Sequence, residues 1–280
     1  MFRTSTHLSR WQLCGLMVAA TLQLGMSAQA QSVEGQAAQT SADEAPLFVC
    51  RFIEVAPENV AEWRERVAEK NAKFGMSDDP ARYGTWLIMS GKRTNQYARG
   101  FVTTAELYSN PKHAVQGMAV TADLPQAAYW QENITPLQKS SGNRVIRQMI
   151  TDLQVTHMDA SQTPKFFKHF SWRLKPGMFE RYLANESKMI EVYKQMDLSV
   201  NFFVSRIIDG GDIMTMTHTY AFDKMSDLPS PELRKQEFNK VHGEGAWDKF
   251  REERIQLMQE NAGIEAETWR YEEKLSNLQP

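Results

Sequence analysis

The chain is poor in cysteine, which limits how it can be stabilised. It has two cysteines in 280 residues, Cys14 and Cys50. Cys14 lies in a segment that we expect to be removed, so the rest of the chain has one thiol and cannot form an internal disulfide. Stability must then come from a hydrophobic core, for which the chain is long enough.

Several motifs of common enzyme classes are also missing. The sequence has no glycine-rich phosphate loop, no Gly-x-Ser-x-Gly elbow, no His-Glu-x-x-His, no Cys-x-x-Cys and no dinucleotide fingerprint. No spacing requires a metal, and we predict neither a metal nor a cofactor. The formal net charge is −2, and it argues against nucleic acid or an anionic membrane as a partner.

The first thirty residues have the pattern of a secretory signal peptide. A basic start is followed by a mostly apolar run at 11–26 that is short for a bilayer span, and then by small residues at 27–30. We expect cleavage after Ala30 and a periplasmic or secreted protein with no membrane segment; a retained anchor is the alternative. Residues 31–46 are small and polar, which predicts a disordered lead-in.

The remainder contains one pattern twice. Phe48 to Pro57 is typical of a strand running into a helix that begins with proline, and Phe167 to Pro176 repeats this order. Proline suits the start of a helix, because its missing N–H would be unpaired there. In both copies a large apolar residue and an aromatic residue follow at the same helical spacing. We therefore predict two similar units, at 47–160 and 161–280.

Hydrophobic periodicity predicts the order βαββαβ in each unit. In the first, strands are expected at 48–55, 83–89, 96–107 and 144–153, with helices after Pro57 and at 127–139, and a turn at 141–143. In the second, strands are expected at 166–174, 200–208, 213–222 and 264–271, with helices at 179–193 and 246–261. Asp209-Gly210-Gly211-Asp212 predicts a hairpin, and 226–245 is a charged, partly helical insertion with no assigned role.

This order is the ferredoxin-like topology, so the fold class is α+β. One such unit leaves one sheet face bare, and two antiparallel sheets packed face to face would form an α+β barrel within the chain. In this topology, over residues 48–274, the chain resembles the dimeric α+β barrel superfamily. That superfamily includes antibiotic-biosynthesis monooxygenases, NIPSNAP-type and EthD-like proteins and the haem-binding chlorite dismutases. The resemblance carries over no catalytic residue, and it leaves monomer and homodimer open.

The strand at 166–174 places polar side chains on one face. Because side chains alternate along a strand, Phe170, Trp172 and Leu174 should lie under the helices. The opposite set, His169, Ser171 and Arg173, would then face the space between the sheets and form an anion or carbonyl site. His169 and Arg173 are catalytic candidates.

The matching positions of the first unit would line the same cavity as ligand-binding residues; they are Cys50, Phe52 and Glu54. The alternative is structural. In it Arg173 pairs with Glu54 or reaches the rim, His169 is a hydrogen-bonded core histidine, and Cys50 is a small buried hydrophobe.

The strand at 213–222 carries a second set of candidates on one face: Met214, Met216, His218 and Tyr220. We expect His218 to be an acid–base group in the same cavity, with Met216 and Tyr220 as ligand contacts; a structural histidine is the alternative. Thioethers beside an imidazole also suit Cu(I). For a haem, His169, His218 and His242 are equal candidates as axial ligand.

Three function classes follow. The first is an exported protein that binds a small molecule between the two sheets, acting as a cofactor-free monooxygenase, isomerase or lyase. The second is a non-catalytic binding or interaction module. The third is a haem or copper protein.

Overall fold

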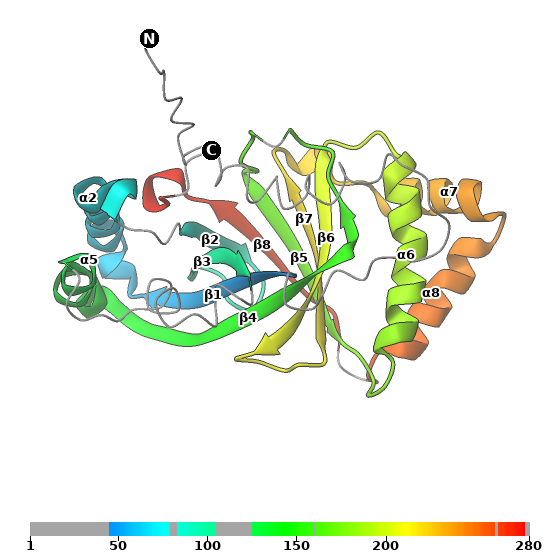
Figure 1. The fold of residues 1–280 in the computed structure, drawn as a ribbon, viewed down its shortest axis with the longest axis horizontal. Coiled ribbons are helices and arrows are strands. Elements are labelled where there is room, and N and C mark those ends of the chain that lie inside the picture. Colours follow the sequence, from blue (N-terminus) through cyan, green and yellow to red (C-terminus); the bar gives the residue numbers. More distant parts are fainter. Residues whose placement is uncertain (1–44, 79–82, 105–124, 160, 261–262, 278–280) are drawn as a thin grey trace, which may run out of the picture.

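The protein was analysed in a computed structural model that describes residues 45–78, 83–104, 125–159, 161–260 and 263–277. Within these ranges, eight strands form one closed barrel, and helices lie at two opposite sides of it (Figure 1). The expected signal peptide and most of the expected lead-in lie outside the described residues. Among the helices described, none is long and apolar enough to cross a membrane.

The first unit begins with strand β1 (Pro46–Val55), followed by a 3-10 turn (Pro57–Asn59) and helix α2 (Val60–Asp78). A hairpin of β2 (Gly84–Ser90) and β3 (Tyr97–Thr104) comes next. Helical turns then run from α5 (Pro125–Tyr129) through η3 (Trp130–Ile134) and η4 (Thr135–Leu137) into β4 (Gln138–Val155).

The second unit repeats this order. It consists of β5 (Phe166–Arg173), α6 (Phe179–Gln195), the hairpin of β6 (Val200–Asp209) and β7 (Thr215–Phe222), η5 (Met225–Asp227), α7 (Pro231–His242), α8 (Ala246–Leu257) and β8 (Glu265–Tyr271). The expected charged insertion is largely α7. A final 3-10 turn, η6 (Glu273–Leu275), follows β8.

The end of the first unit differs from the sequence prediction. The helix expected at 127–139 ends at Leu137, and the turn expected at 141–143 is part of β4. Pro136 lacks the N–H that a continuing helix needs, so the helix ends early. The chain then pairs at once with β1, with Val55 opposite Gln138 and Glu54 opposite Ser140, and this pairing extends the strand.

Strand pairing confirms two ferredoxin-like units that form a barrel within one chain. The first sheet has the order β4-β1-β3-β2 and the second the order β8-β5-β7-β6. Antiparallel pairing of β2 with β8 and of β4 with β6 joins the two sheets at both edges. Each sheet edge is thus covered by the other unit, which removes the unpaired backbone groups that an open edge would expose.

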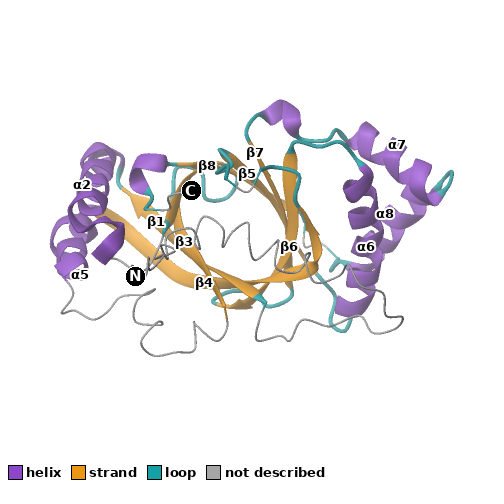
Figure 2. Ribbon diagram, turned by 45° about the horizontal axis from the view of Figure 1, so that its top comes forward, coloured by secondary structure: helices purple, strands orange, loops and turns teal. Residues whose placement is uncertain are grey.

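The outer face of the barrel packs under the helices. Figure 2 shows α6, α7 and α8 together on the second unit and α2 with α5 on the first. The larger core joins strands β5, β6 and β7 to helices α6, α7 and α8. Its buried members include Trp172, Tyr182, Met189, Tyr193, Phe222, Phe238 and Phe250. A smaller core under α2 contains Trp63, Val67, Tyr97 and Ile134.

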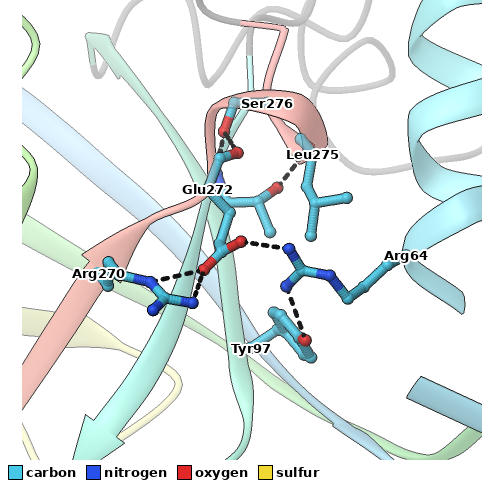
Figure 3. Close-up of polar contacts among 7 residues, drawn as sticks. Arg64, Tyr97, Arg270, Glu272, Leu275 and Ser276 are labelled. Atoms are coloured by element: carbon cyan, nitrogen blue, oxygen red, sulfur yellow. Dashed lines mark hydrogen bonds and ion pairs between the residues drawn. The ribbon is translucent and has the colours of Figure 1, made fainter. Parts of the chain in front are cut away.

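The C-terminal turn η6 fastens the second unit to the first (Figure 3). The buried Glu272 carboxylate accepts hydrogen bonds from Arg64 of α2 at 2.6 Å and from Arg270 of β8 at 2.7 Å. Arg64 also donates to the Tyr97 hydroxyl at 3.2 Å. The Leu275 carbonyl accepts from Thr85 of β2 at 2.8 Å, so the segment from Glu272 to Leu275 is bonded to both a helix and a strand of the other unit.

Candidate ligand-binding site

The barrel interior is a cluster to which both units contribute. Cys50, Phe52, Trp86, Ile88, Ala98 and Trp269 are buried together there, with Phe48, Val145, Phe167 and Tyr271 against them. These residues come from six different strands, which can meet only inside the barrel. Trp86 lies 5.8 Å from Phe167 and 6.2 Å from Trp269 between ring centroids, so aromatic side chains from both sheets are in contact.

His169 points into this interior, as the alternation along β5 predicts. Its exposed fraction is 6%, and its ring lies 4.1 Å from that of Trp269. The Nδ1 atom is hydrogen-bonded to the Thr219 hydroxyl at 2.9 Å. The Nε2 atom is buried and has no hydrogen-bond partner among the described residues. Since buried polar atoms in proteins are nearly always hydrogen-bonded, this nitrogen marks a place where a partner is missing.

An ion pair that the sequence analysis did not foresee lies beside His169. Glu267, opposite His169 in the pairing of β5 with β8, binds Arg93 through two hydrogen bonds of 2.9 and 2.7 Å. The Trp269 indole N–H donates to the same carboxylate at 3.0 Å. Arg93 reaches it from the β2–β3 turn, where Gly91 has φ +104 and a side chain would collide with β8.

Arg147 of β4 is a second unforeseen member of the interior. It lies opposite Phe48 of β1, which belongs to the interior cluster, and its exposed fraction is 6%. Its Nε atom is buried without a hydrogen-bond partner, and no described residue forms a hydrogen bond or ion pair with its guanidinium. The interior therefore holds a buried cation that the described side chains do not neutralise.

The protonation states in the interior follow from burial and from these cations. Burial, with the charges of Arg147, Arg93 and Lys168, holds the pKa of His169 well below its usual value, so the imidazole is neutral at pH 7. Burial raises the pKa of the Cys50 thiol to about 12, although Arg147 and Arg93 oppose this shift. Cys50 is thus an uncharged thiol and not a nucleophile.

Other predicted site residues lie at or near the barrel rim. Ser171 is hydrogen-bonded to Thr217 at 2.9 Å. Arg173 is about half exposed and pairs with Asp212 of the neighbouring hairpin. Glu54 pairs with Lys139 at 2.7 Å. The Arg173–Glu54 pair is therefore wrong, because each side chain has a nearer partner, whereas the other alternative for Arg173, a place at the rim, agrees with the structure.

The expected place of His218 in the barrel interior is also wrong. In the β5–β7 pairing His218 lies opposite Phe170, so it shares the outer face that packs under the helices. Its Nε2 is 2.7 Å from the Tyr182 hydroxyl and 3.3 Å from the Glu186 carboxylate. Met216 and Tyr220 lie in the same helix-covered core, so neither lines the interior with His169.

The residues nominated for a haem or for copper do not fit those groups. The Nε2 atoms of His218 and His242 are taken by Tyr182 and by the Lys188 carbonyl, at 2.7 and 3.0 Å. His169 is buried and packs against the rings of Trp269 and Phe167, 4.1 and 6.5 Å away between ring centroids, which is not an open site for a macrocycle. Among the described residues no group of three His, Cys, Asp or Glu side chains is placed to hold a metal ion.

A surface groove between α2 and α5 is a weaker candidate site. It is lined by Arg66, Glu69, Ala72, Lys73, Tyr129 and Asn133. Its polar groups already pair with one another, because Glu69 accepts hydrogen bonds from Arg66 at 3.0 Å and from Tyr129 at 2.7 Å. The polar groups of the groove therefore need no ligand to complete their hydrogen bonds, in contrast to His169 and Arg147 in the interior.

Comparison with solved structures shows what this arrangement is similar to. A proposed monooxygenase from Lactobacillus acidophilus matches with a TM-score of 0.50 and 12% identity, over 81% of this chain and 94% of that one. A proposed monooxygenase from Fusobacterium nucleatum matches with a TM-score of 0.50 and 8% identity, over 81% and 93%. The fold is that of the dimeric α+β barrels.

At these identities the likeness to other α+β barrels concerns the fold alone. A chlorite dismutase from Candidatus Nitrospira defluvii also matches, at 9% identity and a TM-score of 0.49, over 83% of this chain and 94% of that one. No protein-family model matches this α+β barrel, and neither does any curated protein sequence. Its function has to be argued from its own residues.

Proposed function

We propose that this protein binds a small organic molecule inside its barrel, through side chains that both units contribute. The observation that carries the proposal is the presence of buried, unpartnered polar atoms in the interior: Nε2 of His169 and Nε of Arg147, together with Nε1 of Trp86. Leaving such groups without partners is costly, and a bound molecule would supply them. Aromatic rings beside them provide the apolar contacts that small-molecule sites use.

Native mass spectrometry of the purified protein, followed by tryptophan fluorescence with the molecule found, tests this proposal. Trp86 and Trp269 lie in the interior, whereas Trp63 and Trp172 lie under the helices. We expect Trp269→Phe to remove most of the ligand-dependent fluorescence change and Trp63→Phe to leave it intact. A protein that retains no molecule, and does not respond to a library of small aromatic and carbonyl compounds, would contradict the proposal.

Proton transfer by His169 is the second candidate function. The observation that favours it is a neutral imidazole with an unpartnered Nε2 in the neighbourhood of a guanidinium. Such a nitrogen accepts a proton from a substrate while the cation stabilises the resulting anion, which requires no cofactor. His169→Gln should then abolish turnover and preserve binding. Equal turnover by this variant would leave the protein a binding module.

We also propose that the protein acts outside the cytoplasm. The support is the sequence pattern of residues 1–30, together with an inert, buried Cys50 that suits an oxidising compartment. N-terminal sequencing of the protein from fractionated cells tests this directly. We expect a mature chain that begins at Gln31 in the periplasmic or secreted fraction, and an uncleaved cytoplasmic chain would refute the proposal.

A further inference from the structure

The described side chains of the barrel interior carry more positive than negative charge. Arg93 and Arg147 both hold guanidinium groups, which stay protonated in proteins. The acid among these interior side chains is Glu267. One positive charge is therefore left over, and it comes from β4 of the first unit.

Glu267 is not available to neutralise that charge. Its two oxygens already accept hydrogen bonds from Arg93 at 2.9 and 2.7 Å and from the Trp269 indole at 3.0 Å. No described residue forms an ion pair with Arg147. The Cys50 thiol is uncharged at pH 7, and the His169 imidazole carries no negative charge in either protonation state, so neither provides a counter-ion.

An unpaired buried cation destabilises a fold, and replacing it with an apolar residue of similar volume often stabilises the protein. An apolar residue could take this position in β4, because Val145, the adjacent inward-facing residue of the same strand, is apolar. Arg147 is therefore best explained by a partner that the described side chains do not supply.

We propose that Arg147 binds the charged group of an organic monoanion, a carboxylate or phenolate on an aromatic body, held inside the barrel. The inference rests on the proposed function and specifies its ligand. A single unpaired cation matches a single negative charge, and a guanidinium binds a carboxylate through two parallel hydrogen bonds. The rings of Trp86, Trp269 and Phe167, which pack against one another, would provide the apolar contacts for a flat body. His169 Nε2 provides a further polar contact.

Three probes separate the charge from the shape of the ligand. Benzoate has the ring and one negative charge, benzamide has the ring without the charge, and inorganic phosphate has charge without a ring. We expect benzoate to raise the melting temperature and to bind at least tenfold more tightly than benzamide, measured by tryptophan fluorescence, with no binding of phosphate. Equal affinity for benzoate and benzamide, or binding of neither, would overturn the inference.

Substitutions of Arg147 give the second test. Arg147→Met should weaken benzoate binding at least tenfold, and the ligand-free variant should melt at or above the wild-type temperature because the unpaired charge is gone. Arg147→Lys keeps the charge but loses the planar fork, so binding should weaken several-fold. Arg144→Met is the matched control on the same strand; Arg144 pairs with Asp209 outside the interior, and its loss should not change benzoate binding.

A lower melting temperature for ligand-free Arg147→Met, with benzoate affinity unchanged, would show that Arg147 is a structural residue and refute the inference. The proposed function fails on a different result. If the protein retains a neutral molecule that quenches Trp269, the binding proposal stands and the anion inference is wrong. If it retains nothing and no probe affects the interior tryptophans, both are wrong.

Discussion

The neutral, buried His169 should make the stability of the protein depend on pH. In the unfolded chain an imidazole has a pKa of about 6.5 and takes up a proton as the pH falls. Between pH 7.5 and pH 5.5 this uptake stabilises the unfolded state by about 1.4 kcal/mol per histidine. The folded state does not gain this free energy, because burial and nearby cations hold the pKa of His169 well below the usual value. Stability is therefore full above pH 6.5 and is lost as the pH falls below it.

Urea unfolding of wild type and His169→Gln at pH 7.5 and pH 5.5 measures this effect. The free energy of unfolding of the wild type should fall by about 1.4 kcal/mol more than that of the variant. With a slope near 3 kcal/mol/M, this difference shifts the midpoint by roughly 0.5 M urea.

Ser171→Ala is the matched control for this measurement. It removes a hydroxyl from the same strand and the same face, and it adds or removes no titrating group. It should therefore behave like wild type. If His169→Gln loses as much stability on acidification as the wild type, His169 is protonated in the folded state and the description of the interior is wrong.

Two further pairs of substitutions test the packing outside the barrel interior. Glu186→Gln should cost about 3–5 kcal/mol in urea unfolding, because it leaves the Arg254 charge without its partner at 2.5 Å. Glu253→Gln in a half-exposed pair should cost less than about 1 kcal/mol, and equal losses would contradict the buried-network reasoning. Gly210→Ala should cost more than about 2 kcal/mol, since φ is +74 and a side chain would strike a β4 carbonyl. Gly177 has a similar φ of +76 but open space around it. If Gly177→Ala loses as much stability as Gly210→Ala, backbone strain alone accounts for both losses.

The fold was largely predictable because each strand and helix has a strong local signature. Alternation along 166–174 correctly separated His169 from Trp172, and the Asp-Gly-Gly-Asp turn correctly joined β6 to β7. The end of the helix expected at 127–139 was predicted wrongly, because the strand that follows is set by pairing of Gln138 with Val55. These two residues are far apart in the sequence.

The site was predictable only in part, because it depends on strand register. The alternation in 213–222 groups His218 with Met216 correctly, but it does not say which set faces inward. That is decided by the pairing of His218 with Phe170 and of Thr219 with His169. Arg147 had a local signal, since it lies among apolar residues of a predicted strand. Arg93 had none, because its place in the interior results from the shape of a turn.

The pairing registers also show how the two units differ at matching inward positions. With Phe48 taken as the counterpart of Phe167, Cys50 corresponds to His169, Val145 to Glu267 and Arg147 to Trp269. At each of these three inward positions one copy is ionisable and hydrophilic where the other is hydrophobic or uncharged. Two identical subunits would create such a set of side chains twice, related by a dyad. Two units in one polypeptide instead permit an asymmetric interior, which should bind one ligand molecule per chain in one orientation. A titration that gives a 1:1 stoichiometry would verify this.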